Sequence, residues 1–383
     1  MKLRIGIIGT RGIPNNYGGF ECFAEHLSQR LVVRGHEVIV YSSHNHPNQQ
    51  MIWNGVQVVH CYDPEYRLGS AGQFIYDANC ILDARKRNFD ILLFLGYTSS
   101  SVWGRLHPSG PATIYNMDGF EWKRSKYSKP IKQFLKYAEK LAIRHSDFFV
   151  ADSTYIQSYL NSKYNVSAEY IAYGAEVFNN PNEQVLQQYH LQPRSYNMLM
   201  ARMEPENNIE LILDGFHASA SALEFIVVGN TGNRFGKYLL HKFRNDKRIR
   251  FTGAIFNQQH VNNLIFFSNL YFHGHSVGGT NPSLLEAMSC HAFIAAQDNV
   301  FNKAVLKDNA YYFNTIQDIV QLSAITGRDA ISQQWIQANI NTIRQQYNWN
   351  KITDEYESFF LKCWHQKQAV FKTKMAGSVL RLP

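Results

Sequence analysis

Short apolar segments alternate with helical stretches along most of this chain of 383 residues, and this alternation limits the possible folds more than any other feature. The strand-like segments span residues 3–8, 37–41, 56–60, 90–95, 111–116, 147–151, 197–200, 223–228, 249–251, 269–272, 291–295 and 310–313. Strands separated by helices are typical of βαβ units and parallel sheets. The chain is also too long for one ordinary core. The sequence therefore predicts an α/β protein with two doubly wound, Rossmann-like domains.

A polar segment rich in Asn, Gln and Pro, residues 179–194, lies between the two series of strands. Such composition is typical of linkers and loops. We therefore expect an N-terminal domain over residues 1–178 and a C-terminal domain over residues 179–345. Residues 346–383 follow as a closing segment whose end carries scattered lysines and an arginine.

Composition excludes several classes of protein. Hydrophobic residues make up 45% of the chain, but no apolar run approaches the roughly 18 residues that a membrane span needs. The start of the chain alternates into a strand and lacks the apolar core of a signal peptide. The five cysteines are scattered without metal-ligand spacing, which favours a reducing, cytoplasmic setting and no metal site.

The formal net charge of +8 favours an anionic partner such as a nucleotide diphosphate, a phospholipid headgroup or a nucleic acid. Charge alone does not choose among these. No zinc-finger spacing, aromatic RNA-binding motif or helix-turn-helix is recognisable in the sequence, so we expect no nucleic-acid partner.

A loop of small residues runs directly into a helix at residues 275–288, HSVGGTNPSLLEAM. It follows a predicted strand, and open α/β sheets bind ligands at the carboxyl ends of their strands. Glycines allow close backbone approach, and the amides at a helix start attract phosphate. The residues predicted to bind a donor here are Gly279, Thr280, Asn281, Ser283, Leu284 and Glu286.

A second glycine-bearing loop, GTRGIPNNYGGFE over residues 9–21, follows the first predicted strand. Its spacing does not match GxGxxG, and no acid ends the second strand, so a dehydrogenase is disfavoured. No GxxxxGK[ST] loop is present, which disfavours P-loop hydrolysis. Gly18 and Gly19 are candidates for binding a diphosphate, with a tight turn before a helix as the simpler alternative.

A third turn, residues 200–210, carries Arg202, whose planar guanidinium suits two phosphate oxygens. We expect Arg202 to neutralise charge on a departing diphosphate and Asn207 to contact the donor. An exposed loop arginine without function is the alternative.

Together these motifs resemble the retaining GT-B glycosyltransferases of family four. The resemblance covers nearly the whole chain, including residues 170–176, YIAYGAE, and residues 347–349, YNW, at the start of the family's closing helices. The runs GTRGIPNNYGGFE, DGFEWKR (residues 118–124) and HSVGGTNPSLLEAM are similar to bacterial rhamnosyltransferases and related enzymes of polysaccharide assembly. The resemblance implies two domains facing across a cleft and C-terminal helices that pack back on the first domain. Because helix termini and a cation suit the diphosphate and no DxD motif is present, we expect no metal, and no cofactor besides the nucleotide-sugar co-substrate.

The chain departs from the family pattern at three places. Gly278 stands where relatives carry the first acid of an acid-x7-acid pair that ends at Glu286. Asn207 stands where relatives carry a lysine, which leaves Arg202 as the principal cation for the diphosphate. Residues 116–118 offer no counterpart of the histidine near the family's first-domain cleft.

The chemistry of sugar transfer suggests roles for these residues. Arg202, Gly18, Gly19 and the helix start after Asn281 suit the leaving diphosphate, and Glu286 suits ribose hydroxyls. Asp118 is the candidate for receiving or orienting the acceptor's proton, with an ordinary turn aspartate as the alternative. The residues expected to line the acceptor site are Arg11, Glu121 and Trp122.

The resemblance implies a metal-independent hexosyltransferase that moves L-rhamnose from dTDP-rhamnose to a saccharide acceptor, which is lipid-linked in the usual case. A transferase using a UDP- or GDP-sugar and a non-catalytic sugar- or nucleotide-binding protein are the alternatives.

A predicted helix carries a basic stripe at Lys129, Lys132, Lys136, Lys140 and Arg144. The stripe suits an anionic membrane surface, and the protein would then be a peripheral membrane protein on the cytoplasmic side. The alternative is an ordinary solvent-exposed helix face.

Overall fold

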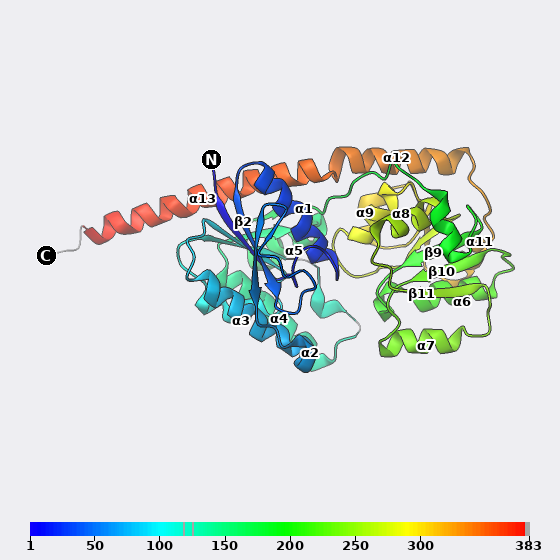
Figure 1. Cartoon of the computed structure of the whole chain (residues 1–383), viewed down its shortest axis with the longest axis horizontal. Helices are drawn as coiled ribbons and strands as arrows, with labels where there is room; N and C mark the ends of the chain where they lie inside the picture. The colour runs from blue at the N-terminus through cyan, green and yellow to red at the C-terminus, as the bar shows by residue number, and fades with distance from the viewer. Residues whose placement is uncertain (118, 125, 380–383) are drawn as a thin grey trace. The chain divides into compact units, whose positions relative to one another are not determined.

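The computed structural model describes residues 1–117, 119–124 and 126–379, which form two compact α/β units. The first unit comprises residues 1–122, 129–172 and the C-terminal part of the chain from residue 349. The second comprises residues 123–128 and 173–348 (Figure 1). Each predicted strand has a counterpart whose ends shift by a few residues.

The first unit contains a sheet of order β3-β4-β2-β1-β5-β6-β7-β8. The strands are β1 (Arg4–Ile8), β2 (Glu37–Ser43), β3 (Ile52–Trp53), β4 (Val56–Cys61), β5 (Ile91–Leu95), β6 (Ala112–Asn116), β7 (Phe148–Ala151) and β8 (Ala168–Tyr170). All neighbours pair in parallel except β3 with β4. The two strands that the sequence did not predict, β3 and β8, are short and lie at the sheet edges, where little apolar pattern is required.

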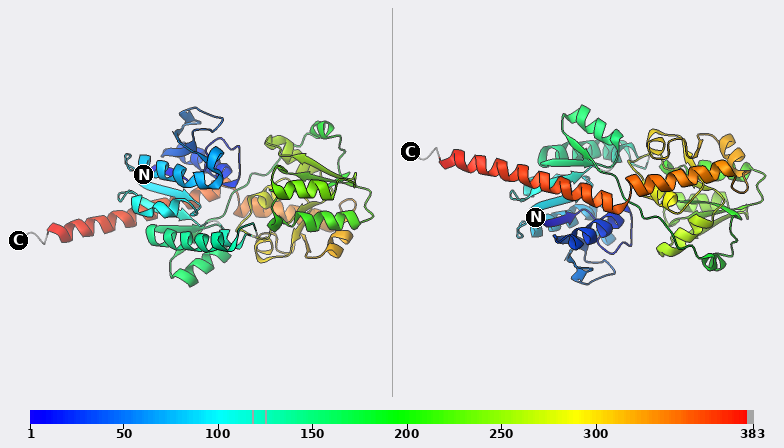
Figure 2. Two further views of the ribbon diagram at one scale, coloured as in Figure 1. Left: turned by 90° about the horizontal axis from the view of Figure 1, so that it is seen from below. Right: turned by 90° about the horizontal axis from the view of Figure 1, so that it is seen from above.

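Helices cover this sheet because its central strands are apolar on both faces, as in β5, where all residues are buried. The helices are α1 (Gly19–Val33), α2 (Glu65–Leu68), α3 (Gly72–Ala84), α4 (Lys129–His145), α5 (Thr154–Tyr164) and α13 (Trp349–Val379), with short 3₁₀ turns η1 (Gly69–Ala71), η2 (Ser100–Leu106) and η3 (Glu121–Lys123). α3 and α4 contact η2. The N-terminal helix α1 contacts the C-terminal helix α13 (Figure 2).

The long helix α13 returns to the first unit, as expected, and polar contacts fix it there. Glu357 accepts hydrogen bonds from Arg34 at 2.7 Å and His36 at 3.0 Å. Farther along, Trp364 donates to Asp90 at 3.0 Å, and Lys367 pairs with Asp147 at 2.7 Å. Among the helices of the described residues, none combines the length and the apolar character needed to cross a bilayer.

The second unit contains a sheet of order β11-β10-β9-β12-β13-β14. The strands are β9 (Tyr196–Met200), β10 (Glu224–Val228), β11 (Ile249–Gly253), β12 (Tyr271–His273), β13 (Ile294–Gln297) and β14 (Tyr311–Phe313), all paired in parallel. The helices are α6 (Ile209–Ala218), α7 (Arg234–Lys242), α8 (Gln258–Phe267), α9 (Pro282–Ser289), α10 (Val300–Leu306), α11 (Ile316–Ser323) and α12 (Ala330–Gln346), with 3₁₀ turns η4 (Glu183–Tyr189) and η5 (Pro205–Asn207).

Helical periodicity builds the core of this unit. α6 buries Ile209, Ile212, Leu213 and Phe216, the spacing of one helix face. The Phe216 ring meets Phe225 of β10 at a centroid distance of 5.0 Å. The sheet is therefore held rigidly beneath the loops that follow its strands.

Apart from residues 123–128, which belong to the second unit, the chain passes between the units at residues 172–173 and 348–349, whereas the sequence placed the first boundary after residue 178 and the second after residue 345. The reason for the first difference is backbone pairing. Ala175 donates to the Tyr347 carbonyl at 2.6 Å, and Phe178 donates to the Ser289 carbonyl at 3.0 Å, so residues 173–178 follow the second unit. Residues 183–189 of the expected linker fold as η4 against α8.

A carboxyl group is buried on α3 of the first unit. Asp77 is 4% exposed and accepts a hydrogen bond from the Ser99 hydroxyl. Burial raises the pKa of Asp77 to about 7, although the hydrogen bond from Ser99 and the charge of Arg11 act in the opposite direction. The fold therefore accommodates the neutral acid better than the carboxylate.

We predict that the stability of the first unit falls as the pH rises from about 4 to about 7. A group whose pKa is about 7 when folded and about 3.9 when unfolded binds more protons in the folded state across this range. Asp77→Asn should therefore raise the free energy of unfolding by up to about 4 kcal/mol near pH 8 and change it little near pH 4. Urea unfolding at a series of pH values measures both.

The control is Asp354→Asn, whose side chain is 66% exposed and pairs with Arg34 at the surface. It should shift the free energy of unfolding by no more than about 1 kcal/mol. A gain from Asp77→Asn that is equal at both pH values would contradict the prediction.

Candidate functional site

The order of strands in the second sheet places a ligand site at its centre. β9 and β12 are neighbours, yet the chain continues from β9 toward β10 and from β12 toward β13, on opposite sides. The connections that leave the carboxyl ends of such a strand pair diverge, and open α/β sheets bind ligands there. Here these connections are residues 201–208 after β9 and residues 274–281 after β12.

The turn after β9 carries Arg202, and the side chain of Asn207 holds this turn in place through a hydrogen bond. Arg202 is exposed, and its carbonyl accepts hydrogen bonds from the Glu204 amide at 2.7 Å and the Asn207 side-chain amide at 2.8 Å. Asn207 itself is only 5% exposed. The Asn207 side chain thus holds the arginine turn, and the donor contact that the sequence assigned to Asn207 stays a prediction.

The loop after β12 is tied to that turn along its first residues. Asn208 donates to the Gly274 carbonyl at 2.8 Å. A Cβ atom on Gly274 would lie 2.1 Å from the Asn207 carbonyl oxygen, so only glycine permits this approach. The Glu206 carbonyl accepts both the amide of Ser276, at 3.2 Å, and its hydroxyl, at 2.7 Å.

Gly278 occupies a backbone conformation that explains part of its departure from the family pattern. Its φ is +139°, in the region that favours glycine, although a Cβ atom there would meet nothing within 4 Å. Backbone strain, and not lack of space, therefore disfavours an acidic residue in this loop conformation. The adjoining Gly279 and Thr280 are buried.

The start of α9 is capped from within the chain. The Asn281 side chain accepts the amide of Ser283 at 3.0 Å and its hydroxyl at 2.7 Å, while the Asn281 carbonyl accepts the amides of Leu284 and Leu285. The amides of Ser283 and Leu284, which the sequence assigned to a phosphate, are thus engaged by Asn281. A phosphate at this position must share these amides or use those of the preceding loop.

Glu286 lies on α9 and is held by a residue that the sequence did not indicate. Gln258, the first residue of α8, donates its side-chain amide to the Glu286 carboxylate. Burial raises the pKa of Glu286, and the hydrogen bond from Gln258 acts in the opposite direction. No motif pointed to Gln258 because it begins a separate helix.

Residues 123–128 bring two cations to the arginine turn. The Arg124 guanidinium lies 3.7 Å from the buried carboxylate of Glu206, and the Lys126 amine lies 3.3 Å from that of Glu204. Their signal in the sequence is the complementary charge of Arg124 and Lys126 and of the acids in the run EPE at residues 204–206.

In the first unit, the loop after β1 folds back on the start of α1. Gly18 is the N-cap residue and Gly19 is the first helical residue. The Glu21 side chain accepts the Arg11 amide at 2.8 Å. The Arg11 guanidinium pairs with Glu65 through bonds of 2.8 and 2.7 Å and stacks 3.8 Å from the centre of the Tyr17 ring. Arg11, which the sequence assigned to the acceptor, therefore braces this loop against α2.

The structure also places Trp122 in a polar cluster. Its indole nitrogen donates to Glu139 at 3.0 Å, and the Lys136 amine lies 4.7 Å from the centre of its ring. Glu139 is 2% exposed and also accepts from Tyr159, Lys163 and Tyr164. Glu121 is half-buried in the same 3₁₀ turn. Asp118, the predicted acceptor-side catalyst, lies outside the described residues.

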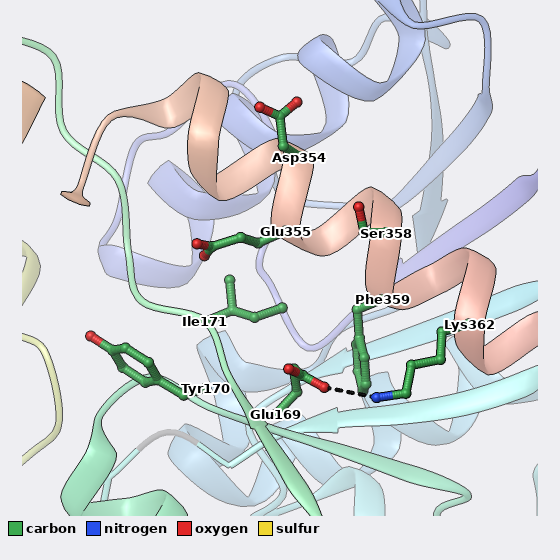
Figure 3. Close-up of a pocket in the computed structure, with 8 residues that line it drawn as sticks. All are labelled: Glu169, Tyr170, Ile171, Asp354, Glu355, Ser358, Phe359 and Lys362. Atoms are coloured by element: carbon green, nitrogen blue, oxygen red, sulfur yellow. Dashed lines mark hydrogen bonds and ion pairs between the residues drawn. The ribbon is translucent and has the colours of Figure 1, made fainter. Parts of the chain in front are cut away.

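A separate hollow lies between β8 and α13 of the first unit (Figure 3). Its lining includes Glu169, Asp354 and Glu355, and Lys362 pairs with Glu169 at 3.2 Å. None of the predicted site residues lines it. Among the residues that the structure describes, no group of acids, histidines or cysteines has the arrangement of a metal site.

Residues 2–176 match the family model described as "Domain of unknown function (DUF1972)". No curated protein sequence matches the chain. Sucrose-phosphate synthase from Thermosynechococcus elongatus has a similar structure, with a TM-score of 0.74 at 14% identity, covering 95% of this chain and 100% of that one.

A glycosyltransferase from Rickettsia africae has a TM-score of 0.69 at 13% identity, covering 94% of this chain and 98% of that one. The Anabaena HepE protein in complex with UDP and glucose has a TM-score of 0.74 at 15% identity, covering 94% of this chain and 100% of that one. Because the likeness extends over both units of each protein, the chain has the GT-B fold, as the sequence predicted.

Proposed function

We propose that this protein is a retaining glycosyltransferase that moves a sugar from a nucleotide diphosphate to a saccharide acceptor. The observation that carries the proposal is the charge balance at the turn after β9. Arg124 and Lys126 face Glu206 and Glu204. Arg202 forms no ion pair with any other residue among those described, and it is exposed beside the loop of residues 274–281. Arg202 is therefore suited to an incoming anion.

Breaking the bond between the anomeric carbon and a diphosphate builds negative charge on the leaving group. The proposal assigns the stabilisation of that charge to Arg202 and the amides of the glycine-bearing loops. Glu286, held by Gln258, retains acceptor capacity for a ribose hydroxyl. On the acceptor side the proposal keeps Asp118, as the group that orients or accepts the proton of the attacking hydroxyl.

Similar folds in complex with UDP and glucose support a nucleotide-sugar donor. The sequence motifs favour L-rhamnose from dTDP-rhamnose, with a UDP- or GDP-sugar as the alternative. The rival proposal from another class is a binding protein that holds a nucleotide sugar without turnover. It is favoured by Gly278, where the family's first acid is missing.

We predict that Arg202→Ala lowers the release of nucleoside diphosphate from the donor by about 100-fold or more, because the charge that builds on the leaving group loses its cation. The assay compares dTDP-rhamnose, UDP-sugars and GDP-sugars with and without EDTA, and EDTA should leave the rate unchanged. Arg244→Ala is the matched control, since Arg244 is exposed ahead of β11, at the opposite end of the strands.

Full turnover by Arg202→Ala with the preferred donor would contradict its assigned role. Binding of a donor by the wild-type protein without any turnover over a panel of acceptors would instead favour the binding protein. Thermal shift establishes binding in that case, because a ligand that binds only the folded state raises the melting temperature.

We further propose that the acceptor is lipid-linked and that α4 rests on an anionic membrane at the cytoplasmic face. Lys129, Lys136, Lys140 and Arg144 are exposed on α4 and Lys132 is half-buried. Ile131 and Tyr137 are 45% and 57% exposed on the same helix. Basic side chains interspersed with exposed apolar ones suit a headgroup layer.

We predict that reversing Lys132, Lys136 and Lys140 to glutamate lowers binding to vesicles with anionic lipid by at least about tenfold, since each basic residue near the surface contributes about 1 kcal/mol. Flotation measures this binding. A control with the same change in net charge reverses the exposed Lys86, Lys237 and Lys247, which lie on other elements. Equal loss of binding in both variants, or loss in neither, would remove α4 from the proposal.

A further inference from the structure

Two stacked histidines, His273 at the end of β12 and His275 in the loop that follows, carry three ring nitrogens without a hydrogen-bond partner among the described residues. The rings of His273 and His275 lie 4.5 Å apart at 17°. His273 is 1% exposed, and among the described residues neither of its ring nitrogens has a partner. The buried Nδ1 of His275 also has none within that part of the chain. Unsatisfied buried polar atoms cost free energy, and at a ligand site a bound molecule often satisfies them.

Hydrogen bonds hold the backbone of His275 in place. The His275 carbonyl accepts side-chain amides from Asn299 at 3.0 Å and Asn302 at 3.2 Å. The next residue, Ser276, is held by the Glu206 carbonyl through both its amide and its hydroxyl. These contacts anchor His275 to β13–α10 on one side and to the arginine turn on the other.

The surroundings keep both rings neutral. Burial lowers the pKa of His273 to about 3. Burial also lowers the pKa of His275 well below its ordinary value, and His273, Arg202 and Arg124 lower it further. A neutral imidazole offers one donor and one acceptor, which match a sugar hydroxyl, whereas a cation would be needed to neutralise a phosphate.

We propose that His275 hydrogen-bonds a hydroxyl group of the transferred sugar, and that His273 is the positioning residue that backs its ring. Gly278 has no side chain to hold the sugar, and His275 lies three residues before it in the same loop, beside Arg202. This assignment rests on the proposed function, because it requires a nucleotide-sugar donor at the ends of β9 and β12.

The test compares affinities for the nucleotide sugar and for the same nucleoside diphosphate without the sugar, measured by calorimetry. His275→Ala should weaken binding of the nucleotide sugar by about five- to tenfold, as for one lost hydrogen bond, and leave the nucleoside diphosphate unaffected. Donors that lack one hydroxyl complete the experiment. The deoxy-sugar missing the bonded hydroxyl should bind equally to both proteins.

His275→Asn is the second variant, since it keeps a polar atom near the position of Nδ1 and guards against a folding defect in the alanine variant. It should recover part of the lost affinity. His241→Ala, an exposed histidine on α7, is the control and should bind both ligands as the wild type does.

Equal weakening of both ligands by His275→Ala would overturn the assignment and indicate a structural role. Unchanged affinity for the nucleotide sugar would also overturn it, while leaving the proposed function in place. If the wild-type protein binds neither ligand, the proposed function itself fails and this inference fails with it.

Discussion

The close approach of the turn after β9 to the loop after β12 is the constraint on which the candidate site depends. Gly274 leaves room for the Asn207 carbonyl, and Asn208 and Glu206 bond the backbone and side chain of the opposite loop. Because both segments leave rigid, adjacent strands, these contacts position Arg202 relative to His275 without the help of a ligand. Such preorganisation reduces the entropy lost on binding.

The turn after β9 also brings acidic and basic side chains together in pairs. Two acids and three cations meet around residues 202–206, and the pairs formed by Arg124 and Lys126 balance the acids. The remaining guanidinium, Arg202, keeps its full charge for a ligand. The dipole of α9 places partial positive charge at the start of the helix. Asn281 already accepts hydrogen bonds from several amides there. The helix therefore attracts an anion more through its electrostatic field than through direct hydrogen bonds.

The sequence predicted those features that depend on local pattern. The apolar strands of the parallel sheets follow from the alternation of short apolar segments with helical stretches, because strands buried on both faces are made almost entirely of apolar residues. Arg202 and Glu286 became candidates because arginine and acids near the ends of strands carry a distinct chemical signal, and their roles stay predictions. The boundary at residue 172 could not be found in this way, since it depends on backbone pairing between residues distant in sequence.

Side-chain partners were the least predictable part of the site. Arg11 and Trp122 look available in the sequence, yet their partners Glu65 and Glu139 lie 54 and 17 residues away. The sequence did not indicate that the buried Asn207 side chain donates to the Arg202 carbonyl, and its predicted contact with the donor stays a prediction. Gln258 reaches Glu286 only because α8 and α9 pack together.

Two buried polar clusters, one in each unit, differ in whether their hydrogen-bonding groups are satisfied. In the first unit Glu139 is surrounded by donors from α5 and from Trp122, so its network is satisfied and fixes α4 and α5 together. In the second unit His273 and His275 stack, and both ring nitrogens of His273 and the Nδ1 atom of His275 have no donor or acceptor among the described residues. A satisfied network rigidifies a fold, whereas an unsatisfied one is costly unless something else binds to it. The unsatisfied histidine nitrogens lie at the carboxyl ends of the central strands, where the α/β fold itself favours ligand binding.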